Sequence, residues 1–164
     1  MMVGAVPAKG GAVSDADRLL QAAQSILLVD WPSRDVPETL ARAGYTVFVK
    51  GGPEPDNYWV HELIDGEVVD RRVGVPPLHA DLVYTYRPIA ELPGIVSLAE
   101  RVSAAAVWLQ SGLNDSGEKD PSGVWLPAAD ARDASAVVEA AGLVFVYAFY
   151  IADAVRRLGG PAGR

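Results

Sequence analysis

The chain has 164 residues, half of them apolar, which is enough for one domain with its own hydrophobic core. Its formal net charge of -7 argues against a general nucleic-acid-binding protein, because such a protein needs a basic face to displace counterions. The chain has no cysteines and only two histidines, which excludes disulfides, thiol chemistry and metal sites built from thiolates or several histidines.

The two ends of the chain differ from its middle. Residues 1–13 have no sustained apolar run, so we expect a flexible N-terminus and no signal peptide. The longest apolar run, 143–152, is too short to span a bilayer. Residues 159–164 are glycine-rich and are expected to form a disordered tail. We therefore expect a single domain over 14–158 in a cytoplasmic protein that contacts no membrane.

The first part of this domain alternates helix and strand. Helical spacing predicts a helix over 14–23, and the apolar run 26–29 is typical of a strand buried on both faces. Asp35 with Glu38 three residues later resembles a capping box that begins a helix, which Gly44 then ends. Residues 45–49 form the next expected strand.

A different pattern follows at 58–73. Segments 58–64 and 67–73 alternate β-branched and polar residues around Asp65-Gly66, a common two-residue hairpin turn. We expect an antiparallel hairpin inserted in, or beside, the main sheet. Its edge, or the aromatic last strand, is a candidate contact for a homodimer.

The second half returns to the alternating pattern. Strands are expected over 81–86, 105–109 and 143–147, with helices over 89–102, 127–141 and 150–158 and a polar loop over 114–123. Strands that alternate with helices imply a parallel sheet with right-handed crossovers. The predicted fold class is therefore α/β: a Rossmann-like doubly wound sheet of about five parallel strands, with the inserted antiparallel hairpin near 58–73.

Ligands of such sheets bind beyond the carboxyl ends of the strands, at the switch point. The first turn, 30–35, offers Ser33, Arg34 and a helix N-terminus, which together can hold phosphate oxygens. The second offers Lys50 beside two glycines. Each also has a structural interpretation, in which Ser33 caps the helix, Arg34 is solvated and Lys50 opens a flexible loop.

The third and fourth turns add further candidates. Arg87, followed by Pro88, comes directly after a buried strand and either faces the crevice or pairs with an acidic neighbour, Asp81 or Glu91. In the fourth turn, a side-chain amide, a hydroxyl and a glycine can hydrogen-bond a polar ligand and give it backbone access; these residues are Gln110, Ser111 and Gly112.

No catalytic constellation is evident. His61 falls in the hairpin and His79 in a loop, and neither has an obvious nucleophile partner, so a surface or structural role is favoured. Trp108 lies inside a strand and is expected in the core. The acidic stretch 114–120 lacks the ligand spacing of a calcium loop. We therefore expect neither an enzyme nor a metal site.

Three segments together resemble a known family. They are DLVYTYRP at 81–88, LPGIV at 92–96 and AVWLQSG at 106–112, and LARAGYTVFVK at 40–50 fits the second unit of the same pattern. The pattern is similar to that of the CoA-binding domain family, small stand-alone bacterial proteins related to the CoA-binding domain of the succinyl-CoA synthetase α subunit. The resemblance covers roughly 26–146 and implies a protein that binds CoA or an acyl-CoA as a carrier, a sensor or a partner of an acyl-CoA enzyme.

The resemblance also implies roles for individual residues. The first turn would hold the diphosphate, the second strand end would lie near the adenosine, and the fourth turn would line the pantetheine. The cofactor-binding residues so implied are Ser33, Arg34, Lys50, Arg87, Pro88, Gln110, Ser111 and Gly112.

One part of the chain departs from the family pattern. The first turn, DWPSRD, is shorter than in relatives and lacks their glycine, and Asp30 carries a negative charge where a diphosphate would approach. That charge is unfavourable unless it is paired or aimed at a ribose hydroxyl. Two alternatives therefore stay open: a degenerate Rossmann domain that binds another nucleotide such as NAD, and a protein-interaction scaffold that has lost its ligand.

Overall fold

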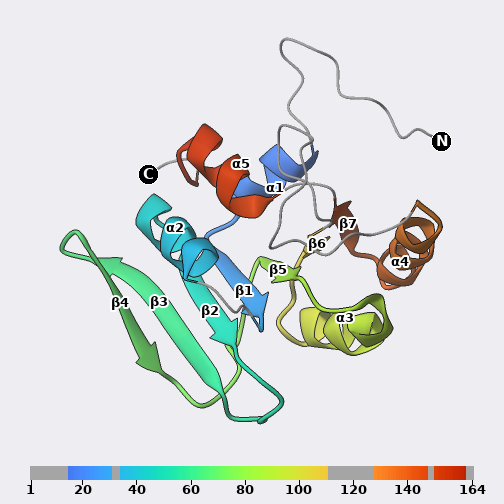
Figure 1. Ribbon diagram of the computed structural model, residues 1–164, viewed down its shortest axis with the longest axis horizontal. Coiled ribbons are helices and arrows are strands. Elements are labelled where there is room, and N and C mark those ends of the chain that lie inside the picture. Colours follow the sequence, from blue (N-terminus) through green and yellow to red (C-terminus); the bar gives the residue numbers. More distant parts are fainter. Residues whose placement is uncertain (1–14, 31–33, 111–127, 148–149, 162–164) are drawn as a thin grey trace.

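The computed structural model describes residues 15–30, 34–110, 128–147 and 150–161 (Figure 1). In chain order the elements are α1 (Asp15–Ala22), β1 (Ser25–Val29), α2 (Asp35–Ala43), β2 (Thr46–Lys50), β3 (Tyr58–Ile64), β4 (Glu67–Arg72), β5 (Leu82–Thr85), a short 3-10 helix η1 (Ile89–Glu91), α3 (Leu92–Arg101), β6 (Ala106–Leu109), α4 (Ala128–Ala140), β7 (Val144–Tyr147) and α5 (Ile151–Leu158). The expected loop over 114–123 lies outside the described residues.

A seven-stranded sheet in the order β4-β3-β2-β1-β5-β6-β7 forms the centre of the fold. The five strands from β2 to β7 in this order are parallel, whereas β3 and β4 pair antiparallel with β2 and with each other. The predicted α/β class, with about five parallel strands and an added hairpin, is confirmed.

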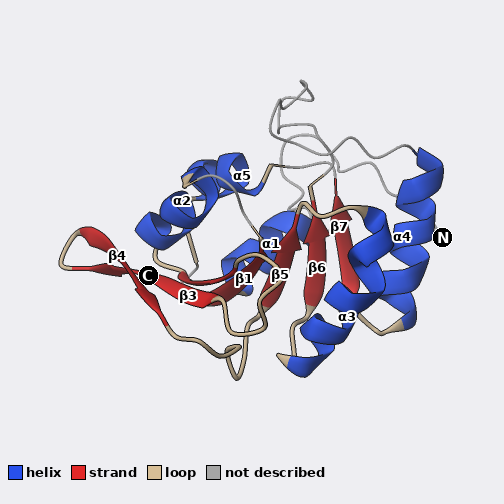
Figure 2. Ribbon diagram, turned by 60° about the horizontal axis from the view of Figure 1, so that its bottom comes forward, coloured by secondary structure: helices blue, strands red, loops and turns tan. Residues whose placement is uncertain are grey.

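Helices cover both faces of the parallel part, with α1, α2 and α5 on one side and α3 and α4 on the other (Figure 2). The sequence of β1 shows why both faces of the sheet are covered. Ile26 and Leu28 belong to the core on the α2 side, and Leu27 and Val29 to the core on the α3 side. A strand buried on both faces needs apolar residues at every position, as the run 26–29 predicted. Trp108 of β6 is fully buried, as predicted.

The hairpin turn is the one that the sequence indicated. Asp65 (φ 51°) and Gly66 (φ 82°) both have positive φ, and Ile64 pairs with Glu67 across them. Two-residue turns of this kind match the right-handed twist of the strands they join, and Asp-Gly tolerates the left-handed backbone that they require. The hairpin continues the main sheet through the antiparallel pair β2–β3.

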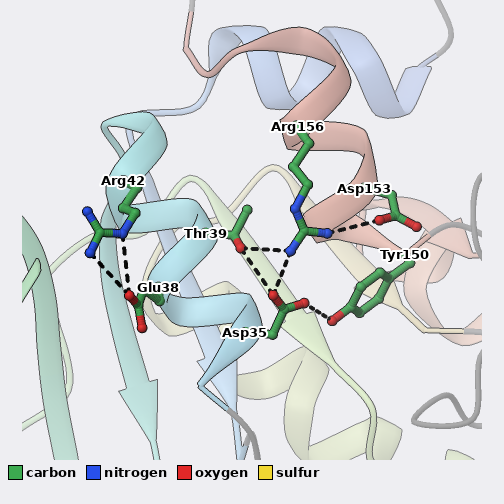
Figure 3. Close-up of polar contacts among 7 residues, drawn as sticks. All are labelled: Asp35, Glu38, Thr39, Arg42, Tyr150, Asp153 and Arg156. Carbon is green, nitrogen blue, oxygen red and sulfur yellow. Dashed lines mark hydrogen bonds and ion pairs between the residues drawn. The ribbon is translucent and has the colours of Figure 1, made fainter.

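The capping box predicted at Asp35 is wrong. Arg34 is the residue before α2, and its side chain makes no capping hydrogen bond. The Asp35 carboxylate instead accepts hydrogen bonds from the Tyr150 hydroxyl and from Nη2 of Arg156, the latter at 2.6 Å (Figure 3). A guanidinium is a stronger partner for a carboxylate than a neutral amide, so the packing of α5 decides where Asp35 points. Gly44 ends α2 with φ 111°, as predicted.

None of the helices within the described residues is long and apolar enough to cross a membrane.

Candidate ligand-binding cleft

The direction of the sheet order reverses at β1, which lies between β2 and β5. A cleft of about 390 Å³ opens at the carboxyl ends of these three strands. Its lining comes from the residues that follow each strand and from η1: Val29, Asp30, Lys50, Gly52, Pro53, Arg87 and Glu91. This is the place where open α/β sheets bind their ligands.

Arg87 is the most heavily bonded side chain of the cleft. Its Nη1 lies 3.0 Å from Oδ2 of Asp30, while Nε and Nη2 lie 3.0 Å and 2.7 Å from the two carboxylate oxygens of Glu91. The expected pairing with Glu91 is thus confirmed, and Arg87 faces the cleft at the same time. The hydrogen bonds with Glu91 raise the pKa of Arg87, and those with Arg87 lower the pKa of Glu91.

Asp30 adopts the positive φ with which the first turn begins, so the turn needs no glycine at this position. Its φ of 55° lies in the left-handed region, which aspartate tolerates better than most residues. Its backbone N–H donates to the carbonyl of Lys50 at 2.6 Å, which ties the ends of β1 and β2 together. Because its carboxylate is paired with Arg87, its negative charge is compensated.

Lys50 lies where two clefts adjoin. Its Nζ donates to the carbonyl of Gly52 at 2.9 Å, and no carboxylate among the described residues lies within ion-pair distance of it. A second cleft, of about 380 Å³, shares three residues with the first and extends over α3; its lining is Val29, Lys50, Ala90, Glu91, Gly94, Ile95 and Leu98. The pair of clefts therefore combines a charged end with a more apolar end.

The remaining predicted site residues lie apart from this cleft or outside the described part of the chain. The side chain of Arg34 is 71% exposed and lines a different cleft on α2, together with Glu38 and Arg42. Gln110 is fully buried, and its side-chain oxygen accepts a hydrogen bond from the Tyr84 hydroxyl. Pro88 precedes η1 and does not line either cleft. Three predicted residues lie outside the described part: Ser33, Ser111 and Gly112.

The structure thus brings together Lys50 and Arg87 of the predicted set. Gly52 belongs to the second turn, where the sequence placed the glycines that give a ligand access, whereas the sequence reasoning missed Pro53 and Glu91 as lining residues and the pairing of Asp30 with Arg87. The sequence indicated Glu91 only as an acidic neighbour of Arg87, which itself lies in the turn between β5 and η1 and not in a helix.

Each of the two histidines lies near an aspartate, and neither lines the cleft. His79 Nε2 lies 2.7 Å from Oδ1 of Asp81, whose other carboxylate oxygen accepts the backbone N–H groups of Gln24 and Ser25. His61 is 9% exposed beneath α2, and its Nε2 lies 3.6 Å from Asp70. Nδ1 of His61 is buried and has no hydrogen-bond partner among the described residues. These same residues include no cluster of three or more side chains that could hold a metal ion.

His61 predicts a pH dependence of stability. Burial lowers the pKa of His61 below its ordinary value of 6.5, although Asp70 opposes this shift. As the pH falls through 6.5, the unfolded chain takes up a proton before the folded protein does, so this contribution to stability is present above that pH and is lost below it. We expect the free energy of unfolding to fall less between pH 7.5 and pH 5 in His61→Gln than in the unchanged protein, measured by urea unfolding. Equal losses in the two proteins would show that His61 titrates normally.

With the geometry in view, the comparisons define the class of protein. The fold is a Rossmann-like α/β domain with a cleft at its switch point. Residues 29–148 match the family described as "CoA binding domain", and because this is more than two thirds of the chain, the protein belongs to the CoA binding domain family.

Two solved structures are similar to the whole chain. One is described as a hypothetical protein from Pyrococcus horikoshii OT3, with 20% sequence identity and a TM-score of 0.57 over 97% of this chain and 100% of that one. The other is the crystal structure of Prb, described as the PH1109 protein redesigned for binding, with the same identity and TM-score over 93% of this chain and 95% of that one. At this identity they support the fold alone. No curated protein matches the chain significantly.

Proposed function

We propose that this protein binds CoA or an acyl-CoA in the cleft at the carboxyl ends of β1, β2 and β5. Membership of the CoA binding domain family is the observation that carries the proposal. The position of the cleft supports it, because nucleotide ligands of open α/β sheets lie at this point.

The charges of the cleft fit a diphosphate in a particular way. The guanidinium of Arg87 is shared between Asp30 and Glu91, whereas the ammonium of Lys50 is held by the carbonyl of Gly52. A diphosphate would take Lys50 from this neutral acceptor and would share the guanidinium of Arg87 with Asp30 and Glu91. Asp30 would have to keep its contact with Arg87 in the complex, because an unpaired carboxylate beside the diphosphate would repel it.

The second cleft fits the rest of the ligand. Its side over α3 is formed by Ala90, Gly94, Ile95 and Leu98, which suit the pantetheine arm or an acyl chain. In this proposal Ser33 of the first turn contacts the diphosphate, whereas Arg34, whose side chain lines a different cleft, is not assigned to the ligand. The turn after β6 contributes further contacts through Ser111 and Gly112, whereas the side chain of Gln110 is buried against Tyr84 and Pro88 lines neither cleft. In this proposal the protein acts as a carrier, a sensor or a partner of an acyl-CoA enzyme.

Calorimetric titration with CoA, acetyl-CoA and NAD tests the proposal. We expect CoA or acetyl-CoA to bind with a dissociation constant near micromolar or tighter, about -8 kcal/mol. NAD should not compete. Binding of NAD alone would favour the alternative nucleotide, and neither heat nor a thermal shift with any of the three would contradict the proposal and favour a scaffold without a ligand.

A further inference from the structure

We propose that the free edge of β4 forms a two-fold antiparallel contact with β4 of a second copy of this chain. β4 is the last strand in the sheet order, and Figure 1 shows it in the outermost position. Among the described residues it pairs only with β3, along all six of its positions. An edge strand of this length presents a row of backbone donors and acceptors that another strand can pair with.

The hairpin turn determines which backbone groups face outward. Ile64 and Glu67 close a two-residue turn, so they form a hydrogen-bonded pair, and such pairs recur at every second residue of an antiparallel ladder. The hydrogen bond from Val73 N–H to the Tyr58 carbonyl continues this alternation. The backbone groups of Glu67, Val69 and Arg71 therefore point to β3. Those of the three intervening residues point to the free edge: Val68, Asp70 and Arg72.

The side chains divide between the two faces of the sheet. Asp70 lies on the α2 side, where its carboxylate is 3.9 Å from Arg34 and 3.6 Å from His61. Alternate residues lie on the opposite face, so Glu67, Val69 and Arg71 share that face. There Val69 is 43% exposed, and Ile64, opposite Glu67 on β3, is 49% exposed. Along β4 on this face Val69 therefore lies between Glu67 and Arg71, and Glu62 lies opposite Val69 on β3, with its carboxylate 3.9 Å from Arg71.

Charge complementarity selects one register. A two-fold axis normal to the sheet and centred on Val69 places Val69 opposite the partner's Val69. It also places Glu67 opposite the partner's Arg71, and this pair occurs twice. The outward backbone groups of Val68 then face those of the partner's Asp70, as an antiparallel ladder requires.

The neighbouring register centred on Val68 places Glu67 opposite the partner's Val69 and so loses both Glu67–Arg71 pairs, and the two registers on the other side bring like charges together. An axis centred on Asp70 places the two Asp70 carboxylates opposite each other, and an axis centred on Arg71 does the same with the two guanidinium groups. Like charges directly opposite on neighbouring strands are destabilising. The contact uses the same strand on both copies, so it closes as a dimer and does not propagate into a fibre. The inference rests on the edge alone and is independent of the proposed ligand.

Exchanging the two charges tests the contact. In a homodimer of Glu67→Arg, both Glu67–Arg71 pairs become pairs of cations. In a homodimer of Arg71→Glu, both become pairs of carboxylates. Each single variant is expected to self-associate at least tenfold more weakly than the unchanged protein, by sedimentation equilibrium. When the two variants are mixed, each altered residue faces an opposite charge, so the mixture is expected to form heterodimers. Arg18→Glu on α1, another exposed arginine, is the matched control and should remain dimeric.

Each other outcome overturns the inference. A monomeric unchanged protein at 100 μM would do so, and so would dimers that persist in both single variants, since the contact would then lie elsewhere, for example at β7. If a single variant fails to fold, as judged by circular dichroism, the double variant E67R/R71E restores the complementary pairs and must be dimeric. A monomeric double variant that folds would contradict the register.

Discussion

Replacing Arg87 with alanine is expected to weaken CoA binding by at least tenfold, which corresponds to about 1.4 kcal/mol. The change removes the guanidinium that lies at the end of β5 in the cleft. It also leaves the Asp30 carboxylate without its partner at 3.0 Å, so that an uncompensated negative charge faces the incoming diphosphate. Calorimetric titration of the variant with CoA measures the effect.

Two further variants separate these causes. Arg18→Ala changes an arginine on α1 whose side chain is 69% exposed, and it should bind CoA as the unchanged protein does. The double variant R87A/D30N removes the unpaired carboxylate as well and should recover part of the lost affinity. If Arg87→Ala binds CoA normally, the diphosphate does not lie at this end of the cleft. If the double variant binds more weakly still, Asp30 contacts the ligand directly.

Replacing Trp108 with alanine is expected to lower the free energy of unfolding by about 3–5 kcal/mol, the range for large aromatic residues removed from a core. Trp108 is fully buried in β6, and its ring centre lies 6.0 Å from that of Tyr84 on the neighbouring strand. β6 itself lies between β5 and β7, so the substitution would leave a cavity in the core that neighbouring side chains cannot easily fill.

Trp59→Ala is the matched control, because it removes the same side chain from an exposed position. Trp59 lies on β3 of the hairpin and is 37% exposed. Its loss should change the free energy of unfolding by about 0.5 kcal/mol, as is usual for surface substitutions. Urea unfolding followed by circular dichroism compares the two. Equal losses would mean that the packing around Trp108 relaxes to fill the space.

The site was harder to predict than the fold. Lys50 and Arg87 were found because basic residues that follow parallel strands meet at one edge of the sheet. Arg34 has the same sequence signal, yet it lies on another cleft beside Glu38. Gln110 belongs to the family-like segment WLQSG, but its side chain is buried against Tyr84. A residue type and its place after a strand do not determine the direction of its side chain.

The sequence by itself determined the strands, most helix boundaries and the hairpin, because these depend on local properties. The apolar run at 26–29, the turn Asp65-Gly66 and the helix-ending Gly44 act through backbone preferences and burial patterns within a few residues. Only the tertiary structure decided the charge pairs between residues far apart in the sequence. Asp30 meets Arg87 57 residues away, and Asp35 meets Arg156 121 residues away. Such pairs form only after the sheet order and the packing of α5 have brought distant segments together, so no local sequence pattern can predict them.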